Sequence, residues 1–301
     1  MRFATYAQTP DGAPHVGVVL GDRIVNVAAA AASLGLAAAP DDLARFIAVG
    51  ACALDAARAI AARFDGDASA GLALDGVRLL APIPHPARNV VCVGLNYADH
   101  VAESKSVTAS DAPAYPVFFT KPPSCVIGPG DAIPCHGHVS TAIDWEVELA
   151  VIIGHQGLDI PEARALDYVF GYTVANDVTA RDLQQRHGQW YKGKGLDGFC
   201  PLGPSVVTVD EIGDPQRLDI GLSVNGVRKQ QSNTRYQIFP VARLIAEWSA
   251  GMTLFPGDIL LTGTPSGVGI GRTPPEFLKP GDLVEAEVQG IGLLRNTVGG
   301  A

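Results

Sequence analysis

The chain of 301 residues contains 47% hydrophobic and 18% charged residues, which is typical of a soluble globular protein and excludes a disordered or coiled-coil chain. Its formal net charge of −9, without a cluster of lysine and arginine, argues against a nucleic-acid partner. No apolar run reaches the roughly 18 residues that a membrane span needs, and the five cysteines lack CxxC spacing, so we expect reduced thiols in a cytoplasmic protein.

The first part of the chain predicts a small α+β unit. Residues 1–28 contain three strand-like runs separated by turn sequences. Over residues 40–64, acidic residues near the start and apolar residues at helical spacing predict a helix. After a proline-spaced segment at 81–88, the sequence changes from alanine-rich helical patterns to short β-rich runs. We therefore predict a small N-terminal domain at 1–85 and a second domain at 86–301.

From residue 89 onward, short β-rich runs alternate with glycine and proline. The tripeptide PGD occurs three times, each time before an apolar run, and indicates a turn whose glycine has a positive φ. An Asn-Gly pair within SVNGVRK predicts a β-hairpin. Helical patterns are few, at 161–167, 179–187 and 239–249. The fold class expected is α+β, dominated by antiparallel or mixed sheet.

Acidic residues alternate in the segment DWEVELAV. In a strand, Asp144, Glu146 and Glu148 share one face, and the apolar run that follows is typical of a buried strand. Burying like charges without compensation is costly, and a hard divalent cation such as Mg²⁺ would relieve the repulsion. Two neighbouring acids of one strand rarely complete a metal site, so a third ligand is expected from another strand end. Asp177, where another apolar strand ends, is the candidate. The alternative interpretation is a solvated strand edge.

Other polar residues suggest chemistry of an active site. His100 and Glu103 are three residues apart, so one helical turn places them on the same face, where a carboxylate can orient an imidazole general base. The alternative is an incidental pair on a surface helix. The polar run up to residue 115 predicts a segment, 100–115, that is more mobile than the sheet and acts as a lid.

Two lysines and one loop are further candidates for binding an anion. Lys121 ends an apolar run, and Lys194 lies in a loop rich in glycine and aromatic residues; ordinary surface lysines are the alternative. The segment TGTPSGVG lacks the lysine and the glycine spacing of nucleotide-binding loops. Its backbone N–H groups and Thr264 could still bind a carboxylate.

Six motifs stand in the order found in the fumarylacetoacetate hydrolase family, which the chain resembles over about residues 89–298. The motifs are GLNYADHVAE, FFTKP, DWEVELAVIIG, GYTVANDVTARDLQ, QWYKGKGLDGFCPLGP and ILLTGTPSGVG. The first eighty or so residues resemble the small N-terminal domain of longer bacterial members. The resemblance implies a layered, mixed β-roll with few helices, in a protein that is usually a homodimer.

The resemblance also implies roles for the candidate residues. It assigns Glu146, Glu148 and Asp177 as ligands of Mg²⁺ or Mn²⁺ and leaves Asp144 out of the ligand set. His100 and Glu103 resemble a dyad that activates water, Lys194 a lysine that stabilises an enolate, and Lys121 another active-site cation. The chain departs from common family residues at Tyr191, Lys192 and Leu196, which we expect beside the substrate.

The activity that the resemblance implies is metal-dependent hydrolysis. The enzyme would cleave a C–C bond in a small anionic β-diketo acid, of the acylpyruvate or fumarylpyruvate type, through an enolate. An isomerase of hydroxymuconate-type substrates or an oxaloacetate decarboxylase would use the same enolate stabilisation without the attacking water. These alternatives stay open, because the shared intermediate defines the chemistry class and not the reaction.

Overall fold

This computed structural model of the chain describes residues 1–108 and 113–300. A large sheet dominates, with the strand order β4-β3-β2-β1-β13-β11-β10-β16-β6-β7. In chain order these strands are β1 (Arg2–Ala7), β2 (His15–Leu20), β3 (Arg23–Asn26), β4 (Leu72–Ala73), β6 (Val90–Gly94), β7 (Val117–Lys121), β10 (Val147–Ile153), β11 (Val169–Asn176), β13 (Cys200–Thr208) and β16 (Ile259–Leu261). Two short strands pair at its side, β5 (Arg78–Leu79) with β1 and β8 (Val126–Ile127) with β13.

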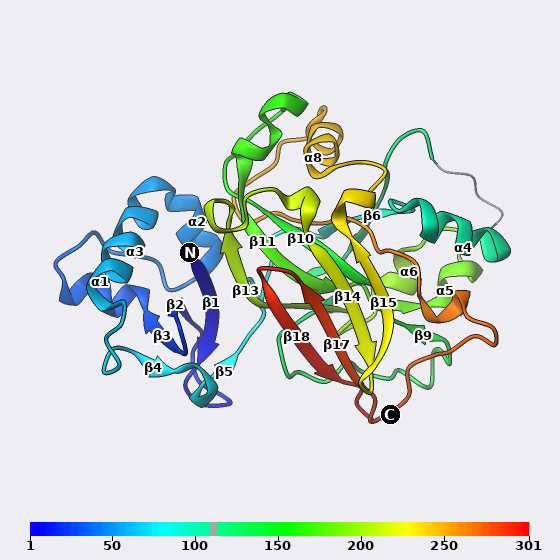
Figure 1. Cartoon of the computed structure of the whole chain (residues 1–301), viewed down its shortest axis with the longest axis horizontal. Helices are drawn as coiled ribbons and strands as arrows, with labels where there is room; N and C mark the ends of the chain where they lie inside the picture. The colour runs from blue at the N-terminus through cyan, green and yellow to red at the C-terminus, as the bar shows by residue number, and fades with distance from the viewer. Residues whose placement is uncertain (109–112, 301) are drawn as a thin grey trace.

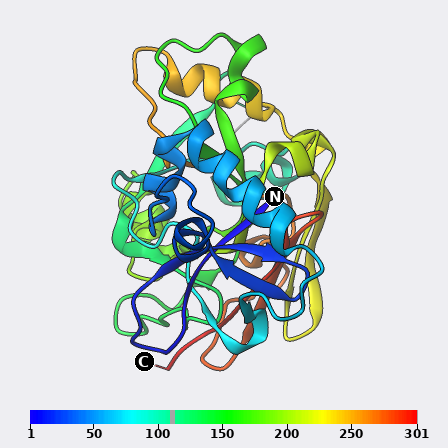
Figure 2. The same cartoon turned by 90° about the vertical axis from the view of Figure 1, so that its left-hand side faces the viewer.

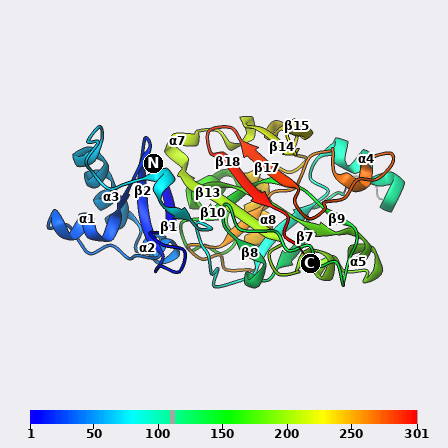
Figure 3. The same ribbon diagram turned by 90° about the horizontal axis from the view of Figure 1, so that it is seen from below.

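Two smaller sheets accompany the large one. β9 (Ile143–Asp144) pairs with β12 (Thr179–Ala180). A four-stranded antiparallel sheet has the order β15-β14-β17-β18 and packs on β10, β11 and β13. Figure 3 shows this sheet from below, beside β10 and β13. Its strands are β14 (Asp219–Val224), β15 (Val227–Asn233), β17 (Leu283–Val288) and β18 (Gly292–Thr297).

The helices gather mainly at the two ends of the molecule (Figure 1). α1 (Val27–Ser33), α2 (Leu43–Val49) and α3 (Ala51–Phe64) lie beside the N-terminal strands, as the end view in Figure 2 shows. α4 (Ala98–Thr108), α5 (Arg181–Arg186) and α6 (Tyr191–Lys194) lie at the opposite end, while α8 (Val241–Ser249) and α7 (Val209–Ile212), which is labelled in Figure 3, lie between. The prediction of a sheet-dominated α+β fold with few helices is confirmed.

β10 is apolar because it separates two hydrophobic cores. Leu149, Val151 and Ile153 belong to the core between the large sheet and the four-stranded sheet. Ala150 and Ile152, on the opposite face, belong to the core that also contains residues of α1, α2 and α3. Both faces of the strand are therefore buried, and this explains why its apolar run is continuous instead of alternating.

The helical predictions differ in outcome. The helical prediction over 40–64 is confirmed, but the segment forms two helices, because Gly50 has a φ of 75° and separates α2 from α3. The carboxylate of Asp42 caps α2 by accepting the N–H of Arg45 at 2.8 Å. The pattern at 161–167 forms a 3₁₀ helix, Glu162–Tyr168, and those at 179–187 and 239–249 contain α5 and α8.

The turn predictions are confirmed. The glycines of the three PGD tripeptides, Gly130, Gly257 and Gly281, have φ values of 79°, 88° and 90°. In each, the aspartate carboxylate accepts the backbone N–H of the residue three positions earlier. Asn225 and Gly226, with φ values of 52° and 75°, join β14 to β15 in the expected hairpin.

The N-terminal strands extend the large sheet instead of forming a separate one. β1 pairs antiparallel with β13, with Phe3 opposite Val206, and continues the sheet into β2 and β3. The division into domains at 1–85 and 86–301 stays a prediction. Of the expected lid, 100–115, residues 109–112 lie outside the described part of the chain. No helix among the described residues is long and apolar enough to cross a membrane.

Candidate active site

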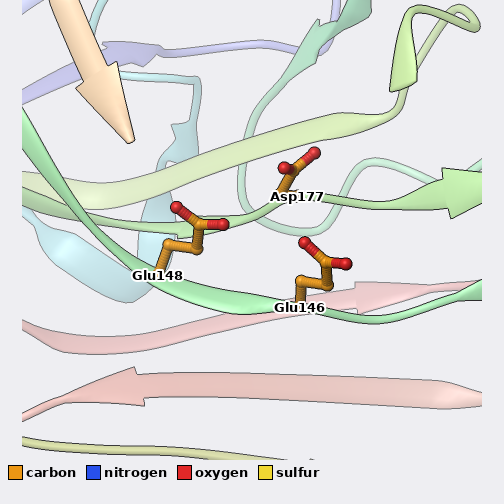
Figure 4. A group of neighbouring side chains, drawn as sticks. All are labelled: Glu146, Glu148 and Asp177. Carbon is orange, nitrogen blue, oxygen red and sulfur yellow. The ribbon is translucent and has the colours of Figure 1, made fainter. Parts of the chain in front are cut away.

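Three carboxylates predicted to act together are brought together in the fold (Figure 4). Glu146 directly precedes β10, Glu148 lies in it, and Asp177 follows the neighbouring β11. Because β10 and β11 are antiparallel, with Glu148 opposite Ala175, the two acidic ends meet. One oxygen from each carboxylate lies within 4.8 Å of the others, and all three residues are buried. We call these three residues the acid cluster.

Asp144 belongs to a different part of the site. It lies in β9, which pairs with β12 and is separated from β10 by two residues. Its carboxylate accepts hydrogen bonds from Arg181 Nε at 2.8 Å and from the N–H groups of Gly269 at 2.7 Å and Ile270 at 2.9 Å. Asp144 therefore anchors the segment at 269–270. The resemblance left Asp144 out of the metal ligands, and the hydrogen bonds of its carboxylate to Arg181 and to the 269–270 backbone are consistent with that expectation.

We predict that Asp144→Asn lowers the free energy of unfolding by about 1–3 kcal/mol, since Arg181, the buried N–H group of Gly269 and the partly buried N–H group of Ile270 depend on this carboxylate. Urea unfolding measures the change. Asp55→Asn is the matched control, because the Asp55 side chain is 70% exposed and its ion pair with Arg58 contributes little. Equal unfolding midpoints for the two variants would contradict the anchoring role.

Two buried lysines reach the acid cluster. Lys194 Nζ lies 2.7 Å from Glu146 Oε2 and 2.7 Å from Asp177 Oδ2. Lys121 Nζ lies 2.7 Å from Asp177 Oδ1 and donates to backbone carbonyls, including that of Phe199 at 2.7 Å. Lys194 also lines the cavity described below, whereas Lys121 is fully buried behind the cluster. This arrangement favours a supporting role for Lys121 over the expected contact with substrate.

The charges of the acid cluster are unevenly compensated. Burial disfavours the charged form of Glu146, but Lys194 and Arg181 outweigh it and hold its pKa at about 2. Burial, followed by the carboxylates of Asp177 and Glu146, raises the pKa of Glu148 well above its usual range. A divalent cation would supply the missing positive charge. The donor set, three hard carboxylate oxygens, fits Mg²⁺ or Mn²⁺.

The predicted His100–Glu103 pair faces the same site. Leu95, with a φ of 57°, turns the chain from β6 toward α4, which carries both residues. His100 Nδ1 lies 3.4 Å from Glu103 Oε2, a long contact of the kind that often tightens when substrate binds. The N–H of Gly267 donates to both oxygens of Glu103 at 3.1 Å. Glu103 is thereby held where it can orient the imidazole.

A cavity of about 480 Å³ joins these groups. It is lined by six of the predicted site residues, His100, Glu103, Glu146, Glu148, Lys194 and Thr264. The hydroxyl of Thr264 accepts a hydrogen bond from Gln230 Nε2 at 2.8 Å, which fixes its position. The cavity therefore offers a proton acceptor, a cation and a candidate metal site to one small molecule.

Some lining residues were not predicted. Arg181 contacts Glu146 Oε1 at 2.7 Å, and the acid at 144, which has no place among the predicted metal ligands, is the sequence signal that could have indicated a buried cation nearby. Phe119 and Trp190 also line the cavity, and their motifs carried no chemical signal. Tyr191 and Lys192, expected beside the substrate, are exposed and are absent from the lining formed by the described residues. That expectation is not supported.

Comparisons with known proteins agree with this geometry. The sequence pattern described as Fumarylacetoacetate (FAA) hydrolase C-terminal matches residues 89–299. The mitochondrial oxaloacetate tautomerase Fahd2a of Rattus norvegicus is 44% identical over 302 residues, covering 99% of this chain and 91% of that protein.

Two solved structures share the whole fold. The fumarylacetoacetate hydrolase from Exiguobacterium antarcticum superimposes with a TM-score of 0.82 at 39% identity over all of both chains. The maleylpyruvate hydrolase from Sphingobium sp. SYK-6, in complex with manganese(II) and pyruvate, has a TM-score of 0.76 at 30% identity over 99% of each chain. With the motifs, the acid cluster and these matches, the chain belongs to the fumarylacetoacetate hydrolase family.

Proposed function

We propose that this protein catalyses the keto–enol tautomerisation of a small 2-oxo acid, with oxaloacetate as the first candidate substrate. The observation that carries the proposal is the buried acid cluster, which faces His100 across one cavity. The name of the rat relative supports oxaloacetate. Tautomerisation thus takes precedence over the C–C hydrolysis expected first from the sequence.

The acid cluster is the proposed metal site. Held by Glu146, Glu148 and Asp177, Mg²⁺ or Mn²⁺ would polarise the 2-oxo group and offset negative charge that develops on the substrate. The manganese in the structure of the Sphingobium enzyme supports this choice of metals. A protein with a net charge of −9 repels an anionic substrate overall, so positive charge has to be supplied locally, and a metal ion held by the acid cluster would supply it.

The remaining chemistry belongs to side chains of this chain. With Nδ1 directed at Glu103, His100 has its Nε2 available to take a proton from the substrate C3 atom. Protonation of the 2-oxo oxygen completes the enol, so one C–H bond breaks, one O–H bond forms and no co-reactant is consumed. Lys194 and Arg181 line the cavity beside Glu146 and add positive charge near the anionic end of the substrate.

C–C bond hydrolysis is the second candidate, favoured by the His100–Glu103 pair. The same imidazole could deprotonate a water molecule, which would then attack the distal carbonyl of an acylpyruvate. The Sphingobium neighbour, a maleylpyruvate hydrolase, supports this reading. For either reaction the protein is proposed to act as a homodimer, as the family resemblance implies.

One assay separates these reactions. We expect the protein with Mg²⁺ to accelerate the decay of the ultraviolet absorbance of enol oxaloacetate without forming pyruvate. Pyruvate is measured in parallel with lactate dehydrogenase. Formation of pyruvate from oxaloacetate would identify a decarboxylase, and formation from an acylpyruvate would identify a hydrolase. An unchanged rate of enol decay would refute the tautomerase proposal.

A further inference from the structure

One wall of the cavity is aromatic. Phe119, in β7, and Trp190, directly before α6, pack edge to face with ring centroids 5.3 Å apart and an interplanar angle of 76°. Both side chains are half-buried, and both line the cavity together with Val93 and Leu95. We call Phe119 and Trp190 the aromatic wall.

The backbone is shaped to receive the Trp190 ring. Gly94 ends β6, and a Cβ added there would lie 2.2 Å from Cζ3 and 2.7 Å from Cη2 of Trp190. Contacts this short do not occur, so a side chain at position 94 would displace the indole. The ring therefore packs closely against a glycine, in a position that a side chain at residue 94 would not allow.

The aromatic wall is linked to the acid cluster through Lys194. Lys194 Nζ, which pairs with Glu146 and Asp177, lies 5.0 Å from the Phe119 ring centroid. Trp190 in turn packs against Phe119, so the contacts run from Lys194 to Phe119 and from Phe119 to Trp190. A 2-oxo acid whose carboxylate end lies at the acid cluster can thus direct its C3 substituent toward an apolar surface. Cavities of about 300–1,000 Å³ hold drug-sized ligands, so one of about 480 Å³ has room beyond a four-carbon diacid.

We propose that the protein also tautomerises 2-oxo acids that carry an aromatic group on C3, and that the aromatic wall selects them. This inference rests on the proposed function, because the same proton leaves C3 and the same oxygen becomes a hydroxyl. Trp190 and Phe119 take no part in the proton transfer. Their contribution is a packing contact with the substituent, which an aromatic ring makes better than a carboxylate does.

The test uses two substrates with the same reacting centre. Phenylpyruvate differs from oxaloacetate in having a phenyl ring in place of the distal carboxylate. With Mg²⁺ present, we expect Trp190→Leu to lower the ratio of kcat/KM for phenylpyruvate to kcat/KM for oxaloacetate about tenfold. Gly94→Ala, which displaces the indole without removing it, should shift the ratio in the same direction. Tyr191→Leu is the matched control, since this neighbouring aromatic residue is 50% exposed and lies outside the cavity lining.

The outcomes distinguish the two proposals. An unchanged ratio in Trp190→Leu, or wild-type turnover of oxaloacetate without turnover of phenylpyruvate, overturns the role of the aromatic wall. Failure of the wild type on oxaloacetate refutes the proposed function instead. In that event calorimetric titration of phenylpyruvate into the Mg²⁺-loaded protein still decides the inference: binding about tenfold weaker in Trp190→Leu supports it, and equal or undetectable binding overturns it.

Discussion

Replacing Glu148 with glutamine is expected to abolish the binding of Mg²⁺ and Mn²⁺, and with it the catalytic activity. Glutamine keeps the size of the side chain, and its amide oxygen can still accept the N–H of Gly263, so the fold should persist. The substitution removes one of the three carboxylates that form the acid cluster. Substitutions outside the ligand set of a metal typically lower affinity by about 10- to 100-fold, so loss of a direct ligand should cost at least about 100-fold.

Calorimetric titration of Mn²⁺ or Mg²⁺ measures this effect without relying on turnover. Glu162→Gln is the matched control, because its side chain is 48% exposed in the 3₁₀ helix Glu162–Tyr168 and contacts Arg243. The control should bind the metal as the wild type does. Metal binding of wild-type strength by Glu148→Gln would show that the acid cluster is not the metal site.

Replacing His100 with alanine should lower the rate of tautomerisation by about 10²- to 10⁴-fold, the usual cost of removing a general base. Metal affinity should stay within about threefold of the wild-type value, since His100 lies outside the acid cluster. The two measurements together separate a proton-transfer role from a metal-binding role.

Exchange of the C3 protons of the substrate with D₂O, followed by NMR, reports the proton transfer directly. The exchange that the enzyme catalyses should disappear in His100→Ala and persist in His155→Ala, whose imidazole is exposed outside the cavity lining. Exchange at the wild-type rate in His100→Ala would assign the C3 proton to another residue. If His100→Ala lowered the rate of acylpyruvate hydrolysis while C3 proton exchange stayed at the wild-type rate, His100 would serve to activate water.

The sequence by itself identified features that depend on residues close together in the chain. The alternation of Glu146 with Glu148, the spacing of His100 from Glu103, and the Asn225-Gly226 hairpin follow from the periods of strands, helices and turns. Asp177 required one further step, the rule that polar ligands collect where buried strands end. The six motifs added the family, which the comparisons confirmed.

Predictions from local periodicity were incomplete where the chain changes direction. Asp144 continued the row of acids in the sequence, but the strand is interrupted after it, and its carboxylate turns to Arg181 and the segment at 269–270. The helix predicted over 40–64 was divided at Gly50, since apolar spacing is insensitive to one residue with a positive φ.

The tertiary structure alone decided which distant residues meet. The pairing of β1 with β13, the burial of Lys121 behind Asp177, and the packing of Trp190 on Gly94 join positions from 56 to more than 200 residues apart. Such contacts depend on how sheets stack and on which side chains fill the space between them, and no short sequence pattern encodes that choice. Residues of the candidate site could therefore be named from the sequence, whereas the shape of the cavity that they line was set by packing.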